Sequence, residues 1–298
     1  MITVYQECPS CHNKNISKRL TAKDHTVSHT FFEIWECSNC SLRFTQSVPG
    51  KNEIDSFYQS ENYISHTDTN KGLINSLYHR VRKRTLNVKR KLIEYQMGSG
   101  DKNILDIGAG TGAFINNMHQ AGWNVIGIEP DEDARATAKK LYDLELRSSE
   151  SLFKLPSGTY DVITMWHVLE HVHDLHEYLD QIKLLLKMGG SIFIAVPNYT
   201  CYDEKIYKEF WAAYDVPRHL YHFSPAAMKI LLAGHGLEIT ASEPMWYDSF
   251  YVSLLSEKYK TGKNNFISGL WNGFVSDVKA MFNKQKCSSL IYVITAKK

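Results

Sequence analysis

The sequence has 298 residues, of which 43% are hydrophobic and 22% charged, a composition that excludes disordered, collagen-like and disulfide-stapled chains. Its 34 basic and 32 acidic side chains give a formal net charge of +2, which excludes a global field that draws the whole chain to nucleic acid. The N-terminus lacks the layout of a signal peptide and no long apolar run is present, so we expect neither a leader nor a transmembrane segment.

The first 48 residues carry two CxxC pairs, separated by 25 residues, and are expected to form a small module of their own. The four cysteines are Cys8, Cys11, Cys37 and Cys40. Two such pairs supply the four thiolates of a structural zinc ribbon, whereas a dithiol redox role needs one pair only. The pattern therefore predicts bound Zn²⁺, with four free thiols in a reducing cytoplasm as the alternative.

Residues 49–100 are expected to be a linker followed by a helix over 72–97. Seven of the twelve residues from 80 to 91 are basic, namely Arg80, Arg82, Lys83, Arg84, Lys89, Arg90 and Lys91. They are spread around the helical turn, which favours a solvated face over a phosphate-binding or nucleic-acid-binding patch.

From residue 101 onward, segments with strand and helix patterns alternate. The predicted strands are 103–107, 123–128, 160–165, 191–196, 237–242 and the C-terminal SLIYVITA, and the predicted helices are 111–120, 131–141, 174–187 and 224–234. Strands spaced by helices of about 10–15 residues imply βαβ units with right-handed crossovers. We therefore predict an α/β fold, a Rossmann-like, doubly wound, mainly parallel seven-stranded sheet over 101–298.

A segment at about 244–287 is inserted before the last predicted strand. Its apolar residues recur at helical spacing, at Phe266, Leu270, Trp271, Phe274, Val278 and Met281. Such a stripe is typical of ordinary core packing. It is also typical of a lid over an apolar substrate, a dimer surface or a membrane-surface helix, and these three alternatives together carry about the same weight as core packing.

The segment ILDIGAGTGAF leads from a predicted strand into a helix. Gly108, Gly110 and Gly112 allow a sharp turn and a close approach of a ligand to the free N–H groups of the helix. Glu129 ends the next strand, 21 residues after Gly108, where a carboxylate can accept both hydroxyls of a ribose. The loop also satisfies the GxGxxA fingerprint of dinucleotide-binding proteins. However, the Asp106 carboxylate would repel a pyrophosphate and suits the ammonium group of S-adenosylmethionine (SAM).

The stretches LDIGAGTG and IGIEPD resemble the first two motifs of the class I SAM-dependent methyltransferases, an arrangement that extends over residues 70–298. The resemblance implies that Asp106, Gly108 and Gly110 hold the methionyl part of SAM, Glu129 the ribose, and Pro130 and Asp131 the adenine. The complete predicted cofactor set is Asp106, Gly108, Ala109, Gly110, Gly112, Glu129, Pro130, Asp131, Glu150 and Trp166.

The next stretch, WHVLEHV, resembles a methyltransferase subgroup that includes quinone O-methyltransferases. His167, Glu170 and His171 share one face of a helical turn, and we predict His167 and His171 as catalytic residues, with His167 as general base. Imidazole, carboxylate and imidazole are also a ligand set for a divalent metal. The turn is similar to that of metal-dependent RNA 2′-O-methyltransferases, although His167 replaces a carboxylate. His219 or His222 would complete the metal site.

The loop FWAAYDVPRHLYHFSP follows the fifth predicted strand, at the place where substrate-side loops are expected. Tyr214, Arg218 and His219 are therefore predicted substrate contacts. The alternative is that Arg218 pairs with Asp215 and holds the loop in place.

Taken together, these features predict a cytoplasmic SAM-dependent methyltransferase that acts on a hydroxyl or carbon acceptor of a small molecule, such as a sugar or lipid-linked intermediate. Its N-terminal module resembles the zinc-binding domains attached to some sugar and small-molecule methyltransferases. The alternatives are an RNA methyltransferase, an NAD(P)-binding oxidoreductase and a non-catalytic SAM-binding protein. Nucleic acid is the less favoured partner, peripheral membrane contact stays open, and the sequence does not determine the oligomeric state.

Overall fold

A computed structural model describes residues 2–58, 73–98 and 102–297, and side chains within the first described helix from residue 84 onward. The chain forms two compact units. The first comprises Met1–Tyr63, His167–Leu179 and Ile194–Lys297, and the second comprises Ile64–Trp166 and Asp180–Phe193. The cysteine-bearing segment thus shares a unit with the C-terminal strands, whereas the sequence suggested three consecutive segments.

The first unit contains a small antiparallel sheet with the order β10-β4-β3-β2. Its strands are β2 (Ile16–Lys23), β3 (Phe31–Cys37), β4 (Arg43–Thr45) and β10 (Tyr221–His222), and a separate pair joins β1 (Ile2–Thr3) to β5 (Val48–Pro49). Tyr221 lies opposite Phe44 in the register of β10 and β4. The N-terminal module is therefore completed by a strand that arrives more than 170 residues later in the chain.

The larger sheet has six strands in the order β11-β12-β9-β8-β6-β7. The strands are β6 (Asn103–Ile107), β7 (Asn124–Ile128), β8 (Tyr160–Trp166), β9 (Leu186–Pro197), β11 (Leu237–Pro244) and β12 (Ser289–Ala296). β6 pairs in parallel with β7 and β8, and β11 pairs antiparallel with β12. Ile104, Leu105 and Ile107 are all buried, as expected for a parallel strand covered on both faces.

The predicted α/β fold class is confirmed, but the sheet has six strands where we expected seven. In the described part of the chain, the missing strand is reduced to one parallel bridge between Arg147 and Ile128. The amide and carbonyl of Arg147 bond to Gly127 O and Glu129 N. Only this one residue pairs with β7, and a single bridged residue is too short a segment to form a strand.

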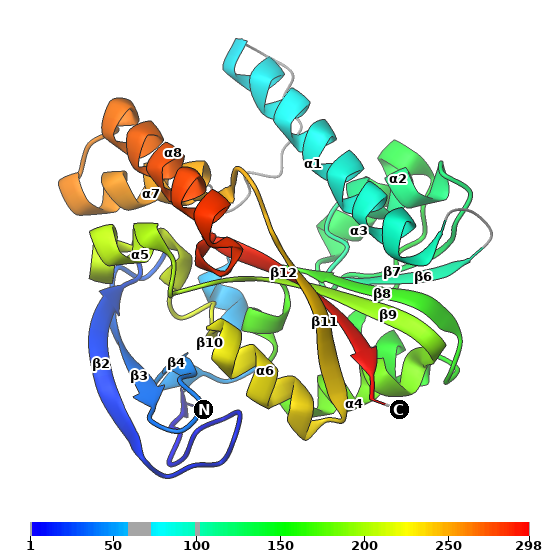
Figure 1. The fold of residues 1–298 in the computed structure, drawn as a ribbon, viewed down its shortest axis with the longest axis horizontal. Helices are drawn as coiled ribbons and strands as arrows, with labels where there is room; N and C mark the ends of the chain where they lie inside the picture. Colours follow the sequence, from blue (N-terminus) through cyan, green and yellow to red (C-terminus); the bar gives the residue numbers. More distant parts are fainter. Residues whose placement is uncertain (1, 59–72, 99–101, 298) are drawn as a thin grey trace. The chain divides into compact units, whose positions relative to one another are not determined.

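The second unit places α1 (Leu73–Met97), α2 (Ala113–His119) and α3 (Glu132–Tyr142) around β6 and β7 (Figure 1). α4 (Leu175–Leu185) runs from one unit into the other. Asp131 caps α3, because its carboxylate accepts hydrogen bonds from Asp133 N and Ala134 N at 2.8 and 3.2 Å. The capping residue thus fixes where the chain leaves the end of β7.

The helices of the first unit are α5 (Tyr202–Tyr207), α6 (Pro225–Gly234), α7 (Asp248–Thr261) and α8 (Phe266–Phe282). Ser224 caps α6 by accepting a hydrogen bond from Ala227 N at 3.0 Å, a role for which serine is well suited. The inserted segment folds as the hairpin of α7 and α8 (Figure 1). Within the described ranges, no helix has the length and apolar content needed to cross a bilayer.

Candidate cofactor site and histidine cluster

The glycine loop joins β6 to α2, and all three of its predicted glycines have positive φ angles. The values are +74° at Gly108, +53° at Gly110 and +79° at Gly112, a region that side chains other than glycine rarely adopt. A Cβ on Gly112 would lie 3.0 Å from the Cβ of Ala138, whereas a Cβ on Gly110 would meet nothing within 4 Å. Gly112 therefore serves helix packing, and the space above Gly110 is open to a ligand.

Glu129 ties the end of β7 to this loop. Its Oε2 accepts a hydrogen bond from Gly110 N at 2.7 Å, and its Oε1 accepts one from Asp131 N at 3.0 Å. Burial raises the pKa of Glu129 despite these two hydrogen bonds. A carboxylate has about four acceptor positions, so this group retains capacity for the hydroxyls of a ribose.

Asp106, the last acidic residue before the loop, is 1% exposed. Thr164 donates a hydrogen bond from Oγ1 to Oδ1 of Asp106 at 2.5 Å. Burial nevertheless raises the pKa of Asp106 to about 7, with the charge of Lys89 acting in the opposite direction. Because the charged form of this acid is poorly stabilised by its surroundings, the site favours a ligand that brings a positive charge.

Trp166 ends β8 and packs in the same unit. Its ring lies edge-on to Phe114 with centroids 5.2 Å apart, and Lys89 Nζ lies 4.2 Å from the indole centroid. Its buried Nε1 has no hydrogen-bond partner among the described residues. The sequence predicted Trp166 as a cofactor contact but missed Lys89, which was counted only as one of the basic residues of a solvated helix.

The remaining predicted cofactor residues have mixed positions. Ala109 is buried within the loop, and its amide donates to Ile128 O at 2.9 Å. Pro130, Asp131 and Glu150 are exposed. Glu150 lies in the 3₁₀ helix Ser149–Lys154, and a hydrogen bond with Ser148 lowers its pKa.

The chemical groups of these residues match the groups of SAM. The loop offers backbone N–H groups and open space, Glu129 offers acceptor positions for a ribose, and Asp106 is a buried acid that needs a cation. A pyrophosphate would meet these two acids, whose pKa values are raised by burial, and is therefore the less suitable ligand.

His167 directly follows Trp166 in the chain and adopts a left-handed backbone conformation, with φ at +58°. Its amide donates to Ala195 O at 2.9 Å. Its Nδ1 lies 3.3 Å from Glu170 Oε1, and its Nε2 lies 3.3 Å from the Sδ atom of Met245. A strained backbone held by a hydrogen bond is typical of functional positions, and the carboxylate orients the imidazole.

Glu170 is fully buried, and its Oε2 has no hydrogen-bond partner in the described part of the chain. Burial raises its pKa, but the hydrogen bond and charge of His167, together with the charges of His219 and His171, outweigh this effect and lower the pKa. One ligand atom each of Glu170, His171 and His219 lies within 4.8 Å of the others. The cluster therefore differs from the expected trio, because His219 takes the place of His167.

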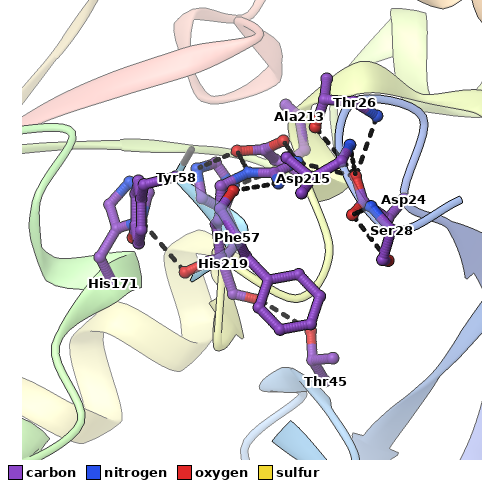
Figure 2. Close-up of polar contacts among 12 residues, drawn as sticks. Asp24, Thr26, Ser28, Thr45, Phe57, Tyr58, His171, Ala213, Asp215 and His219 are labelled. Carbon is purple, nitrogen blue, oxygen red and sulfur yellow. Dashed lines mark hydrogen bonds and ion pairs between the residues drawn. The ribbon is translucent and has the colours of Figure 1, made fainter. Parts of the chain in front are cut away.

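Backbone carbonyls orient both imidazoles of this trio. Nδ1 of His171 lies 3.0 Å from Arg218 O, and Nδ1 of His219 lies 2.8 Å from Ala213 O. The hydroxyl of Tyr58 also lies 2.9 Å from Nδ1 of His171 (Figure 2). Because a carbonyl can only accept, each Nδ1 carries a proton, and Nε2 is the nitrogen that could bind a metal. Burial lowers the pKa of His171 to about 4, so this imidazole is neutral near pH 7.

Arg218 is 1% exposed and lies among acidic partners in the first unit. Its Nη2 lies 2.6 Å from Asp215 Oδ1 and 3.2 Å from Asp24 Oδ1, and its Nη1 donates to Phe57 O at 2.9 Å. Figure 2 shows Asp24 and Asp215 at this cluster. This packing favours the alternative in which Arg218 holds the loop.

Tyr214 is also buried, and its hydroxyl donates to Glu204 Oε1 at 2.7 Å and accepts from Arg43 Nη1 at 2.7 Å. Substrate contact by Tyr214, Arg218 or His219 stays a prediction. His222, the other candidate for completing a metal site, lies against Thr45 at 3.1 Å instead.

The four predicted zinc ligands come together in the first unit. Sγ of Cys8 lies 3.5 Å from Sγ of Cys40, and Sγ of Cys11 lies 3.6 Å from Sγ of Cys37. All four sulfur atoms lie within 4.8 Å of one another. Four thiolates at about 2.3 Å from a tetrahedral zinc ion are about 3.8 Å apart, so this cluster fits the ion.

Comparison with known proteins places these features in context. A family model described as "Methyltransferase domain" matches residues 77–242. The human mitochondrial ubiquinone biosynthesis O-methyltransferase is 31% identical over 163 residues, which are 49% of this chain and 44% of the human protein. The chain thus spans about half the length of the curated relatives it matches.

Two solved structures share the fold. A SAM-dependent methyltransferase from Archaeoglobus fulgidus superposes with a TM-score of 0.51 at 23% identity, covering 73% of this chain and 94% of that one. Magnesium protoporphyrin IX methyltransferase from Synechocystis PCC 6803, solved with bound SAH, has a TM-score of 0.53 at 12% identity, covering 84% and 100%.

Proposed function

Because this chain belongs to the methyltransferase-domain family, we propose that it transfers a methyl group from SAM to a hydroxyl or carbon acceptor of a small molecule. The observation that carries the proposal is the occurrence of Asp106, the glycine loop and Glu129 within one unit, with Gly110 N bonded to Glu129. The names of the curated relatives favour a hydroxyl acceptor over carbon.

The cofactor supplies an electrophilic methyl group when it is bound. Asp106 holds the amino end, because an ammonium offsets the unfavourable burial of its charge. Gly110 leaves room for the close approach of the methionyl part, and Glu129 keeps the loop in shape while accepting ribose hydroxyls.

His167 is the general base in this proposal. Its Nδ1 lies 3.3 Å from Glu170 Oε1, so this carboxylate orients the ring and would stabilise the imidazolium that forms when Nε2 removes the acceptor's proton. We expect His167→Gln to lower kcat by about 100-fold or more and to leave SAM affinity unchanged. His119→Gln is the matched control, because His119 lies on the exposed end of α2. An unchanged kcat for His167→Gln would remove the base assignment but not the cofactor assignment.

Calorimetric titration of the full chain with SAM, SAH and NADH tests the cofactor assignment. We expect saturable binding of SAM and SAH and no binding of NADH. Saturable NADH binding without SAM binding would identify an oxidoreductase instead. Transfer of labelled methyl groups from SAM to a panel of phenols, catechols and sugars then separates an enzyme from a non-catalytic SAM-binding protein.

A divalent metal at Glu170, His171 and His219 is a second proposal, supported by the buried Oε2 of Glu170 that lacks a described partner. Such an ion would help a substrate hydroxyl lose its proton. Metal analysis of the purified chain should give one equivalent in addition to the zinc proposed at the four cysteines, and His219→Ala should remove this equivalent whereas His235→Ala should retain it. Equal metal content in both variants would refute this site.

Structural zinc at the four cysteines is likewise proposed, on the sulfur geometry given above. We also keep a cytoplasmic location as a proposal, although the human relative is named as mitochondrial.

The RNA methyltransferase alternative has less support. Arg80, Arg82 and Lys83 have side chains outside the described residues, and Lys89 is buried against Trp166 rather than presented to solvent. Salt-sensitive RNA binding lost on neutralising Arg84, Arg90 and Lys91 would restore this alternative.

A further inference from the structure

The helix α8 carries its small residues on the packed face and its large apolar residues on the outer face. Gly269 and Gly273 face α7, where an added Cβ would come within 2.8 Å of Leu254 Cδ2 and of Phe250 Cα respectively. Ser276 and Ala280 are also fully buried. A larger side chain has no room on the face of α8 that packs against α7. The large apolar side chains of α8 are therefore not buried in this contact.

The outer face is the reverse of an ordinary amphipathic helix. Seven large apolar residues of α8 are between 48% and 88% exposed, namely Phe266, Ile267, Leu270, Trp271, Phe274, Met281 and Phe282. Leu270, Trp271 and Phe274 follow Ile267 at spacings of three and four residues, and Met281 lies two turns beyond Phe274. A contiguous exposed patch of this kind marks an interaction surface rather than scattered surface apolar residues.

The exposed charges around this outer face are mainly positive, with Glu243, which pairs with Lys284 at 2.9 Å, as an acidic neighbour. Between residues 247 and 286, every exposed charged side chain is a lysine, at positions 258, 260, 263, 279 and 284. None of the three acidic residues of the same described segment is fully exposed, and two of them are partly buried. Glu257 is buried, Asp277 accepts a hydrogen bond from Ser249 at 2.7 Å, and Asp248 accepts one from Ser289.

We propose that the exposed face of α8 with its surrounding lysines docks on an anionic lipid bilayer surface. Aromatic and aliphatic side chains enter the boundary between headgroups and acyl chains, and the lysines bind anionic headgroups. A second copy of this chain would bring the same lysines together and is disfavoured by charge. The proposal concerns attachment to a membrane surface and does not depend on the methyl-transfer reaction.

The test is co-sedimentation of the full chain with vesicles of phosphatidylcholine alone or of phosphatidylcholine and phosphatidylglycerol in equal parts. We expect binding to the anionic vesicles only, weakened when the salt rises from about 0.05 M to about 0.5 M. Trp271→Ser with Phe274→Ser, and separately Lys258→Glu with Lys263→Glu, should each weaken binding by about tenfold or more.

Leu184→Ser is the matched control, because Leu184 is a 58% exposed apolar residue on α4, and its binding should equal that of the wild type. All variants alter exposed side chains, and equal melting temperatures establish that they fold. Equal binding to both kinds of vesicle, or no binding to either, would overturn the proposal. The proposal would also be overturned if the chain did not bind vesicles but formed a concentration-dependent dimer that the Trp271→Ser, Phe274→Ser variant abolished.

Discussion

The amide of Gly110 donates a hydrogen bond to Oε2 of Glu129 at 2.7 Å. This bond connects the glycine loop to the end of β7. The loop's left-handed glycine is therefore held by the same carboxylate that is proposed to accept the ribose. Removal of this carboxylate should therefore weaken cofactor binding and change the conformation of the loop at the same time.

Replacing Glu129 tests this coupling directly. We expect Glu129→Ala to weaken SAM binding by about tenfold or more, since it removes charged acceptors for two hydroxyls and the tie to Gly110. Glu132→Ala is the control, because Glu132 is exposed on the first turn of α3. Calorimetric titration measures both, and equal dissociation constants would show that Glu129 does not serve the cofactor.

The raised pKa of Asp106 predicts a pH-dependent affinity for SAM. Burial raises this pKa to about 7, so the neutral acid predominates in the free protein below pH 7. The ammonium of SAM requires the carboxylate, and binding should therefore weaken by about tenfold for each pH unit below 7. Asp106→Asn should bind weakly with a flatter pH profile between pH 5 and 8, and a profile as steep as that of the wild type would assign the dependence to another group.

The same shift bears on stability with the opposite sign. A folded-state pKa raised above the unfolded value contributes stability that is fully present below the unfolded pKa and is lost as the pH rises through about 7. Without cofactor, the wild type should lose stability relative to Asp106→Asn as the pH rises from 4 to 7. SAM should reverse that loss, as thermal unfolding would record.

The tetracysteine cluster predicts a metal-dependent N-terminal module. Cys8→Ser with Cys11→Ser should lose one equivalent of zinc and unfold at lower temperature, because structural zinc contributes directly to folding. Cys201→Ser is the matched control. Its thiol lies apart from the cluster and caps α5 by accepting from Glu204 N, a role that serine also fills. Retention of zinc in the double variant would refute the site.

The buried position of Arg218 predicts a structural role that can be separated from substrate contact. Arg218→Met leaves the carboxylates of Asp24 and Asp215 without their partner, and we expect a loss of about 3–5 kcal/mol in the free energy of unfolding. Arg19→Met, which breaks an exposed 3.6 Å pair with Glu36, should change it by less than about 1 kcal/mol. If denaturant titration found Arg218→Met as stable as the wild type but inactive, the predicted substrate role would be favoured.

The sequence by itself determined the features whose physics is local. The glycine loop, the acid at the end of β7 and the two CxxC pairs are short-range patterns, because the strand–loop–helix turn and the metal knuckle each need specific residues at fixed spacing. Asp106 was identified in the same way, from the conflict between its charge and a pyrophosphate.

Only the tertiary structure decided which distant groups meet. Arg218 and Asp24 pair across 194 positions, and His219 rather than His222 lies beside Glu170 and His171. No periodicity encodes such pairings. The outward face of α8 was undetermined for another reason: the helix has only two charged residues, Asp277 and Lys279, so the pattern shows a largely apolar helix but not which side is buried. The backbone of α7 lies close to Gly269 and Gly273, where only small residues fit, and this contact determines which side of α8 is buried.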